Sequence, residues 1–221
     1  MITQGNIPSM QHIKKPAGGS RSKKQRTQAQ TTGAIRIISG QWRGRKLPVL
    51  AADGLRPTTD RTKETLFNWL MNDIAGRVCV DAFAGSGSLG FEALSRGAKQ
   101  VIFIEKNKMA SAQLIKNLNL LNVDPHRASV QTGDTIEWLS KLANDKPDLI
   151  FLDPPFQQSL VKRALSVIEH RQILAPGGLV YLEMEQPAPL LPDASYWDTL
   201  KINTTAHFSY RLLQSLNANL D

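Results

Sequence analysis

Apolar and polar positions follow two alternating periods through the middle of the chain. Short apolar runs, such as Val78–Ala82 and Leu149–Leu152, are typical of buried strands. Stretches with apolar residues three and four apart, such as Lys108–Leu121, predict amphipathic helices. The same pattern predicts strands at Val101–Ile104, Ser129–Gln131 and Leu179–Met184, and helices at Leu89–Arg96, Thr135–Leu142 and Leu160–Ile168. Repeated strand–helix units predict an α/β fold with a mostly parallel sheet and helices on both faces.

The two ends of this series have a different pattern. Ala34–Leu50 alternates on either side of Ser39-Gly40, which predicts a small N-terminal β-hairpin. Tyr196–Ile202 and His207–Leu213 predict an antiparallel pair that closes the chain. We expect a tail at 1–33, the hairpin at 34–53 and the main domain at 54–221.

Composition narrows the class of protein. Cys79 is the only cysteine among 221 residues, so no disulfide can form within the chain. The histidines are scattered, without metal-ligand spacing, and no apolar run is long enough to span a membrane. We expect a cytoplasmic, monomeric protein with neither a metal site nor a membrane segment.

Positive charge is concentrated at the N-terminal end. Residues 1–63 hold 13 Lys and Arg against two acids, whereas the remainder holds 14 against 17. This asymmetry indicates a polyanionic partner. Residues 1–33 carry six basic residues, no acid and no apolar periodicity, which predicts a disordered tail. The tail is either a solvated extension or an RNA-binding arm.

The predicted hairpin and the loop after it carry the other basic residues. Basic side chains beside an aromatic ring suit phosphate contact and base stacking, although a solvated edge hairpin would also be basic. Two further arginines flank the positive N-terminal end of a helix that we expect to end near Asn72. The predicted RNA-binding residues are Arg36, Trp42, Arg43, Arg45, Lys46, Arg56 and Arg61.

A glycine-rich loop follows the first strand of the series. Gly85, Gly87 and Gly90 match G-x-G-x-x-G between a predicted strand and helix, and Glu105 lies 20 residues after Gly85. A carboxylate at Asp81 would repel a pyrophosphate but would attract a cation. S-adenosylmethionine offers a sulfonium and an ammonium group, and no phosphate. The loop therefore favours S-adenosylmethionine over NAD, with Glu105 on the ribose and Asp134 near the adenine.

Asp153-Pro154-Pro155-Phe156 follows the buried run Leu149–Leu152 directly. Proline cannot continue a sheet, so the chain leaves the strand stiffly. Asp153 and the Pro154 carbonyl could accept hydrogen bonds from an exocyclic amine, while Phe156 stacks on an unpaired or flipped base. The alternative role for Asp153 is an ordinary turn residue.

Four segments together resemble a known family. DAFAGSGSLGFEALSRGA (Asp81–Ala98) and DPPF (Asp153–Phe156) resemble class I S-adenosylmethionine-dependent amino-methyltransferases. RIISGQWRGRKLPV (Arg36–Val49) and LRPTTDRTKETLFNWL (Leu55–Leu70) are similar to the bacterial RsmD family, the 16S rRNA guanine(966)-N(2)-methyltransferases.

The resemblance implies a Rossmann-like, seven-stranded sheet with a reversed last hairpin. It implies 16S rRNA as substrate, within a partly assembled small ribosomal subunit. Asp153, Pro154 and Phe156 would be catalytic. The cofactor would be held by Asp81, Phe83, Gly85, Ser86, Gly87, Glu105, Lys106, Asp134 and Thr135. Ala82 and Ser88 stand where the family pattern would lead us to expect Leu and Ala.

Other functions fit parts of the pattern. The same chemistry could act on another rRNA base, on DNA or on a protein glutamine, although no sizeable target-recognition domain is evident and the basic hairpin disfavours a protein substrate. A NAD-dependent oxidoreductase would use the same glycine loop. A non-catalytic RNA-binding module would not need Asp153.

Overall fold

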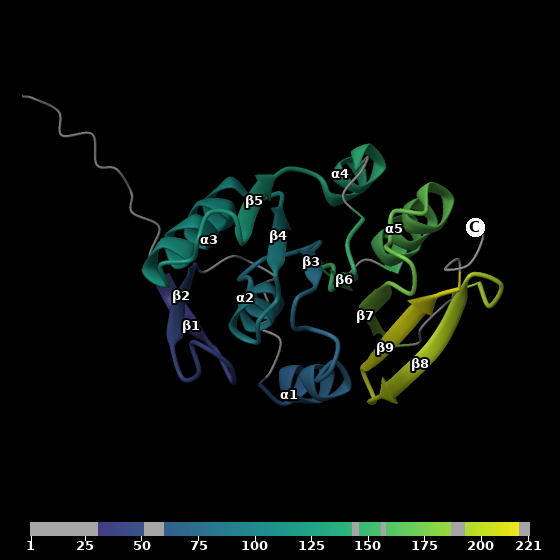
Figure 1. Ribbon diagram of the computed structural model, residues 1–221, viewed down its shortest axis with the longest axis horizontal. Helices are drawn as coiled ribbons and strands as arrows, with labels where there is room; N and C mark the ends of the chain where they lie inside the picture. The colour runs from purple at the N-terminus through teal and green to yellow at the C-terminus, as the bar shows by residue number, and fades with distance from the viewer. Residues whose placement is uncertain (1–30, 51–59, 143–145, 156–157, 187–192, 217–221) are drawn as a thin grey trace, which may run out of the picture.

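A computed structural model describes residues 31–50, 60–142, 146–155, 158–186 and 193–216. Its central feature is a seven-stranded sheet in the order β5-β4-β3-β6-β7-β9-β8 (Figure 1). The strands are β3 (Val78–Asp81), β4 (Gln100–Glu105), β5 (Ala128–Thr132), β6 (Leu149–Leu152), β7 (Leu179–Glu185), β8 (Trp197–Thr204) and β9 (Phe208–Ser215). Strands β3 to β7 are parallel, and β9 lies antiparallel between β7 and β8. The predicted Rossmann-like sheet with a reversed terminal hairpin is confirmed.

Five helices pack on the two faces of this sheet within the described residues. They are α1 (Asp60–Trp69), α2 (Ser88–Ser95), α3 (Lys108–Leu120), α4 (Thr135–Lys141) and α5 (Gln158–Arg171). Helices α1, α2 and α3 share one apolar core with the hairpin, and α4 and α5 share the other. Strand β6 shows why both cores exist, because Phe151 faces the first and Ile150 the second, and both are fully buried.

Local sequence explains where the helices begin. The Asn107 side chain accepts hydrogen bonds from the N–H groups of Met109 and Ala110, and so caps α3. Asp134 caps α4 in the same way. Both residues directly follow a strand or its next turn, so each cap starts a helix at the carboxyl edge of the sheet. None of the described helices is long and apolar enough to cross a membrane.

The N-terminal hairpin consists of β1 (Thr31–Arg36) and β2 (Lys46–Leu50), paired antiparallel. It differs from the prediction in two ways. The first strand begins at Thr31, so the expected boundary at residue 33 falls inside it. The tight turn expected at Ser39-Gly40 is instead a longer connection. A backbone hydrogen bond between the two arms, 2.9 Å from the Ile37 N–H to the Arg45 carbonyl, lies before Ser39-Gly40, and the chain reverses over the whole segment 37–45. Residues 1–30 of the predicted tail lie outside the described part of the chain.

Candidate functional site

The carboxyl ends of β3, β4 and β6 meet where the order of the strands reverses. From β3 the chain passes outward through β4 to β5, and then returns to β6 on the other side of β3. Asp81 ends β3, Glu105 ends β4, and Asp153 directly follows β6. Ligands of open α/β sheets bind in the crevice at such a switch point. Three of the predicted site residues are therefore brought to one crevice.

The glycine loop between β3 and α2 needs its glycines. Gly85 and Gly87 have φ angles of 50° and 77°, in the left-handed region that favours glycine. A Cβ on Gly90 would lie 2.2 Å from the Phe103 ring, so only glycine lets α2 pack this closely on β4. Phe83 and Ser86 of the same loop are partly exposed. The loop is thus a tight turn that brings backbone close to any bound ligand.

Glu105 joins this loop to the next strand. Its Oε2 accepts a 2.8 Å hydrogen bond from the Gly85 N–H, and its Oε1 accepts one of 2.6 Å from the Asn107 N–H. Each carboxylate oxygen has a second lone pair. Glu105 is partly exposed, so it can still accept hydrogen bonds from two adjacent hydroxyl groups.

Asp81 is a buried acid. It is 3% exposed, and its Oδ2 accepts a 2.9 Å hydrogen bond from the Gly90 N–H. Burial raises the pKa of Asp81 to about 7; the Gly90 N–H opposes this, and the negative charges of Asp153 and Glu105 add to it. A buried carboxylate with a raised pKa among other acids favours a cationic partner.

Asp134 and Thr135 lie at the end of β5. The Asp134 cap on α4, chiefly the N–H of Glu137, lowers the pKa of this carboxyl below its usual range, and Lys106 lies 3.6 Å from its Oδ2. The Thr135 hydroxyl is buried and donates to the Ala82 carbonyl. That hydroxyl therefore ties α4 to β3, whereas the Asp134 carboxylate and the Lys106 side chain remain accessible to a ligand.

The hydrogen-bond acceptors at the crevice fit S-adenosylmethionine. An ammonium, a sulfonium and ribose hydroxyls call for acceptors, and Asp81, Glu105 and Asp134 supply them. A pyrophosphate would need donors or positive charge, yet the charges that shift the pKa of Asp81 are those of the Asp153 and Glu105 carboxylates. The side chain of Lys106, 81% exposed, forms an ion pair with one of these acceptors, Asp134.

Asp153 and Pro154 are partly exposed beyond the end of β6, so a substrate can reach them. Asp153 is close enough to Asp81 to raise its pKa, so this segment adjoins the crevice. Phe156, the predicted stacking residue, lies outside the described residues.

Glu183 was not predicted, and its position in β7, two residues before the end of that strand, makes it a candidate site residue. Leu152 pairs with Leu182 in parallel register, so Asp153 and Glu183 come next on the two neighbouring strands, Asp153 just past the end of β6 and Glu183 within β7. Beneath them the buried rings of Phe151 and Tyr181 pack edge to face at 6.5 Å. Burial raises the pKa of Tyr181, and the negative charges of Glu183 and Asp153 raise it further, which places both carboxylates near this hydroxyl. Only the register of β6 and β7 shows that Glu183 is a neighbour of Asp153. In the sequence, the one sign of it is an acid within the apolar run Leu179–Met184.

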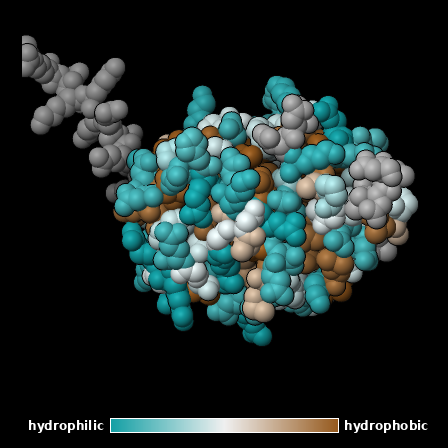
Figure 2. Space-filling model, in the orientation of Figure 1, coloured by the Kyte–Doolittle hydropathy of each residue, from teal (hydrophilic) through white to brown (hydrophobic). Residues whose placement is uncertain are grey.

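Five of the predicted RNA-binding residues are exposed: Arg36, Arg43, Arg45, Lys46 and Arg61. Hydrophilic side chains cover most of the visible face of the molecule, including the region of the hairpin and α1 (Figure 2). Trp42 corrects the prediction: it is 8% exposed and belongs to the core between the hairpin and the sheet, so it cannot stack on a base. Arg56 lies outside the described residues.

Two other chemistries gain no support from the described residues. Burial raises the pKa of the Cys79 thiol to about 12, so it would not act as a nucleophile. No group of three His, Cys, Asp or Glu side chains in the described part of the chain is arranged to hold a metal ion.

Comparison with known proteins places this site in context. Residues 35–214 match the family model described as "Conserved hypothetical protein 95". The chain is 50% identical to Ribosomal RNA small subunit methyltransferase D of Haemophilus influenzae over 184 residues, 83% of this chain and 95% of that protein. It is 43% identical to the protein of the same name from Escherichia coli K12 over 183 residues, 83% of this chain and 91% of that one.

A solved structure agrees with these similarities. The structure of yhhF from Escherichia coli, named as a proposed methyltransferase, has a TM-score of 0.75 at 40% identity and covers 85% of this chain and 100% of its own. The residues that match the family model, 35–214, include β2 of the hairpin, the glycine loop and the end of β6.

Proposed function

Because the chain belongs to the RsmD family of S-adenosylmethionine-dependent methyltransferases, we propose that it methylates the exocyclic 2-amino group of a guanine, position 966, in 16S rRNA. The observation that carries the proposal is the placement of Asp153. This carboxylate follows β6 at the switch point, with Asp81 of β3 on one side and Glu183 of β7 on the other.

The chain's own residues hold the cofactor through acceptors. S-adenosylmethionine, when bound, supplies an electrophilic methyl group on its sulfonium. Asp81 would accept from the ammonium of the methionine end, Glu105 from the ribose hydroxyls and Asp134 from the adenine amine. Gly85 and Gly87 let the loop backbone approach closely, and Phe83, Ser86 and Lys106 line the crevice around it.

Asp153 would act on the nucleophile. The lone pair of an exocyclic amine is delocalised into the base, which makes the nitrogen a weak nucleophile. Hydrogen bonds from the amine to the Asp153 carboxylate and the Pro154 carbonyl would localise that lone pair and stabilise the positive charge that develops on nitrogen. Phe156 would stack on the base. The remaining requirement is in-line positioning of amine and methyl group.

Two adjacent carboxylates favour guanine over adenine. The edge of guanine presents two neighbouring donors, the N1–H and the 2-amino group, whereas adenine presents an acceptor at N1. Asp153, just past the end of β6, and Glu183, within β7, are side by side and could accept from both guanine donors. The same pair would repel the N1 lone pair of adenine.

The exposed basic residues would dock the RNA. Arg36, Arg43, Arg45 and Lys46 lie on the hairpin and its turn, and Arg61 lies at the start of α1. Such side chains contact phosphates and fix the register of the RNA without reading its sequence. We assign the hairpin of β1 and β2 this docking role, for a monomeric, cytoplasmic enzyme that acts on a partly assembled small subunit.

Methylation of small subunits from cells that lack this enzyme tests the proposal. Incubation with the protein and labelled S-adenosylmethionine should modify one guanine, mapped by nuclease digestion and mass spectrometry. Naked 16S rRNA serves as the parallel substrate. Methylation of adenine, or incorporation into protein, would overturn the guanine assignment, and a melting shift with NAD but not with S-adenosylmethionine would overturn the cofactor.

A further inference from the structure

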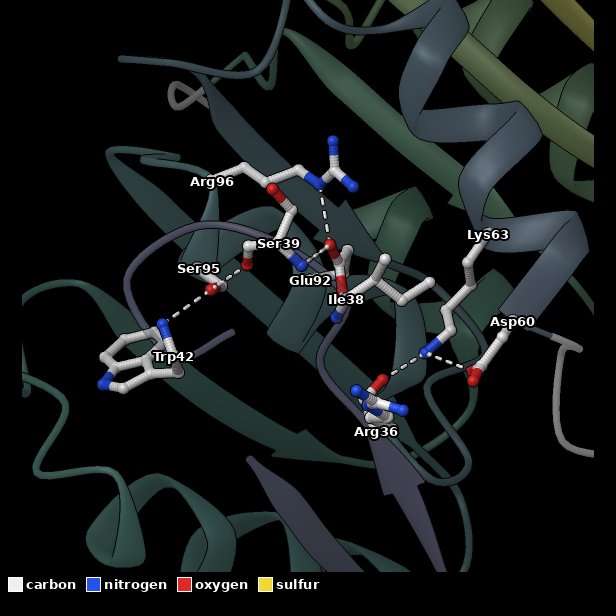
Figure 3. Close-up of polar contacts among 9 residues, drawn as sticks. All are labelled: Arg36, Ile38, Ser39, Trp42, Asp60, Lys63, Glu92, Ser95 and Arg96. Carbon is white, nitrogen blue, oxygen red and sulfur yellow. Dashed lines mark hydrogen bonds and ion pairs between the residues drawn. The ribbon is translucent and has the colours of Figure 1, made fainter. Parts of the chain in front are cut away.

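Helix α2 carries a buried polar cluster on the side away from the cofactor loop. The Glu92 side chain is fully buried and Ser95 is 3% exposed, both on the face of α2 that meets the connection 37–45 of the hairpin (Figure 3). A buried carboxylate costs several kcal/mol unless hydrogen bonds and charge satisfy it. The hydrogen-bond partners of Glu92 and Ser95 therefore identify the segment that the cluster stabilises.

Glu92 holds the first part of the connection. Its Oε2 accepts a 2.8 Å hydrogen bond from the Ile38 N–H, and its Oε1 accepts one of 3.0 Å from the Ser39 N–H. The Arg96 guanidinium donates to the same Oε1 at 2.7 Å and so neutralises the carboxylate. Arg96 also lies 4.8 Å from the centre of the Phe67 ring, which links the cluster to α1.

Ser95 holds the second part. Its hydroxyl accepts a 3.0 Å hydrogen bond from the Trp42 N–H and donates one of 2.5 Å to the Ser39 carbonyl, while its own carbonyl accepts from the Gln41 N–H at 2.7 Å. The fit is close: a Cβ on Gly40 would lie 1.9 Å from that Ser95 carbonyl oxygen. The connection is therefore seated on α2 through its backbone, leaving its basic side chains directed elsewhere.

A third anchor fixes the end of β1 to α1. The Lys63 ammonium is 1% exposed, donates a 2.5 Å hydrogen bond to the Arg36 carbonyl and lies 3.5 Å from Asp60 (Figure 3). The hairpin is thus bound to two helices by buried charged groups. Apolar packing alone would not require such groups, so they indicate that the position of the hairpin is fixed specifically.

Helix α2 begins at the cofactor loop, which gives this anchoring a functional meaning. Gly90 donates its N–H to Asp81, and Glu92 lies two residues further along the same helix. A helix rises by about 1.5 Å per residue, so Glu92 and Ser95, which come five and eight residues after the N-cap Gly87, lie only about 7 and 12 Å from the loop along one rigid helix. The basic residues Arg43 and Arg45 lie in the segment that Glu92 and Ser95 hold.

We propose that Glu92 and Ser95 are positioning residues for the RNA: by seating the connection 37–45 on α2, they hold the basic side chains of the hairpin at a fixed place relative to the cofactor loop. The inference rests on the proposed function. It assigns to the hairpin a rigid docking role and to a buried acid, remote from the reacting atoms, a role in substrate affinity.

The test compares Glu92→Gln, which keeps the shape of the side chain but removes its charge, with Ser95→Ala and with Glu169→Gln. The control Glu169 accepts a 2.7 Å hydrogen bond from the Trp197 indole, so its substitution makes the same change of carboxylate to amide at another structural acceptor, on the opposite face of the sheet. We expect Glu92→Gln to raise the KM for small subunits about tenfold, as loss of charged hydrogen bonds would, and Ser95→Ala, which loses neutral hydrogen bonds, to raise it by about three- to tenfold. The Kd for S-adenosylmethionine should stay within about twofold of the unaltered protein.

Hydrogen exchange supplies a readout that stability alone would not change. The amides of Ile38, Ser39 and Trp42 should exchange faster in the cluster variants, and those of β3 should not. An unchanged KM for small subunits in both variants, or a parallel loss of affinity for cofactor and RNA, would overturn the proposal. RNA binding is measured beside turnover: absence of methylation by the unaltered protein refutes the proposed function, whereas equal RNA affinity of all variants refutes positioning. If Glu92→Gln fails to fold, Ser95→Ala decides.

Discussion

The N–H of Gly90 donates a 2.9 Å hydrogen bond to the carboxylate of Asp81, nine residues earlier in the chain. The bond links the first turn of α2 to the end of β3. It is the main stabilising contact of an acid that is otherwise removed from water, and burial outweighs it, so the pKa of Asp81 rises to about 7. The crevice therefore holds an acid whose charge depends on pH in the physiological range.

Affinity for S-adenosylmethionine should fall as the pH is lowered through 7. An ammonium binds the ionised form of Asp81, so below the pKa of about 7 binding must first remove a proton. We expect the Kd to rise about tenfold per pH unit between pH 7 and 5.5. Calorimetry in buffers of different ionisation enthalpy would also detect the released proton. Asp81→Asn is the control, with weak and pH-independent binding; a pH-independent Kd in the unaltered protein would contradict the assignment.

Asp81→Asn should also stabilise the protein without cofactor at pH 8. The folded pKa lies above the unfolded value of 3.8, so the favourable contribution is complete below pH 3.8 and is lost as the pH rises through 7. Asparagine carries no charge and can still accept from Gly90. The free energy of unfolding should increase by up to roughly 4 kcal/mol at pH 8 and by much less at pH 5. Denaturant melts at both pH values measure this, and a uniformly destabilised variant would argue against it.

The sequence predicts this crevice because its parts are local. A strand, a glycine turn and an acid at the end of the next strand follow one another within the 28 residues from Val78 to Glu105, and the parallel sheet brings Asp81 and Glu105 together. Asp153 is distant in sequence but is marked by the buried strand before it. The order of the strands then places it beside Asp81.

Other features depend on tertiary contacts. Trp42 stands among basic residues, and only the docking of the hairpin on α2 shows that its ring is buried. Glu183 becomes a neighbour of Asp153 through the register of β6 and β7. Glu92 falls in a helix that is buried on all sides, where periodicity cannot indicate which partner an acid has.

Replacement of Asp153 by alanine should lower kcat by roughly 100- to 1,000-fold, because the amine loses the acceptor that localises its lone pair. The Kd for S-adenosylmethionine should change little or improve, since a negative charge near Asp81 is removed and the pKa of Asp81 falls. Single-turnover methylation and cofactor titration separate the two effects. Unchanged turnover would refute the mechanism.

Glu183→Gln should weaken discrimination between guanine and 2,6-diaminopurine at the target position. Diaminopurine keeps the 2-amino group but has an acceptor at N1, which a carboxylate repels and a glutamine amide can satisfy. We expect kcat/KM for the guanine substrate to fall about tenfold while that for diaminopurine falls less or rises. The measurement uses short RNAs carrying either base. An unchanged ratio of kcat/KM values would show that Glu183 does not face N1.

Charge reversal at Arg43 and Arg45 should weaken RNA binding most at low salt. Both side chains are exposed on the hairpin connection, and an arginine that no longer neutralises a phosphate no longer releases counterions when the RNA binds. For single-stranded RNA the magnitude of the slope of log K against log salt should decrease by about 1.4 when two phosphates are no longer neutralised.

Lys162 and Arg163 provide the matched control, because they are adjacent, exposed basic residues on α5, on the other face of the sheet. Their reversal to glutamate makes the same change in net charge, so an equal effect of the two pairs would indicate a long-range field instead of direct binding by the hairpin. Equal reductions in affinity at every salt concentration for Arg43 and Arg45, with a lowered melting temperature, would indicate that the hairpin had come off α2.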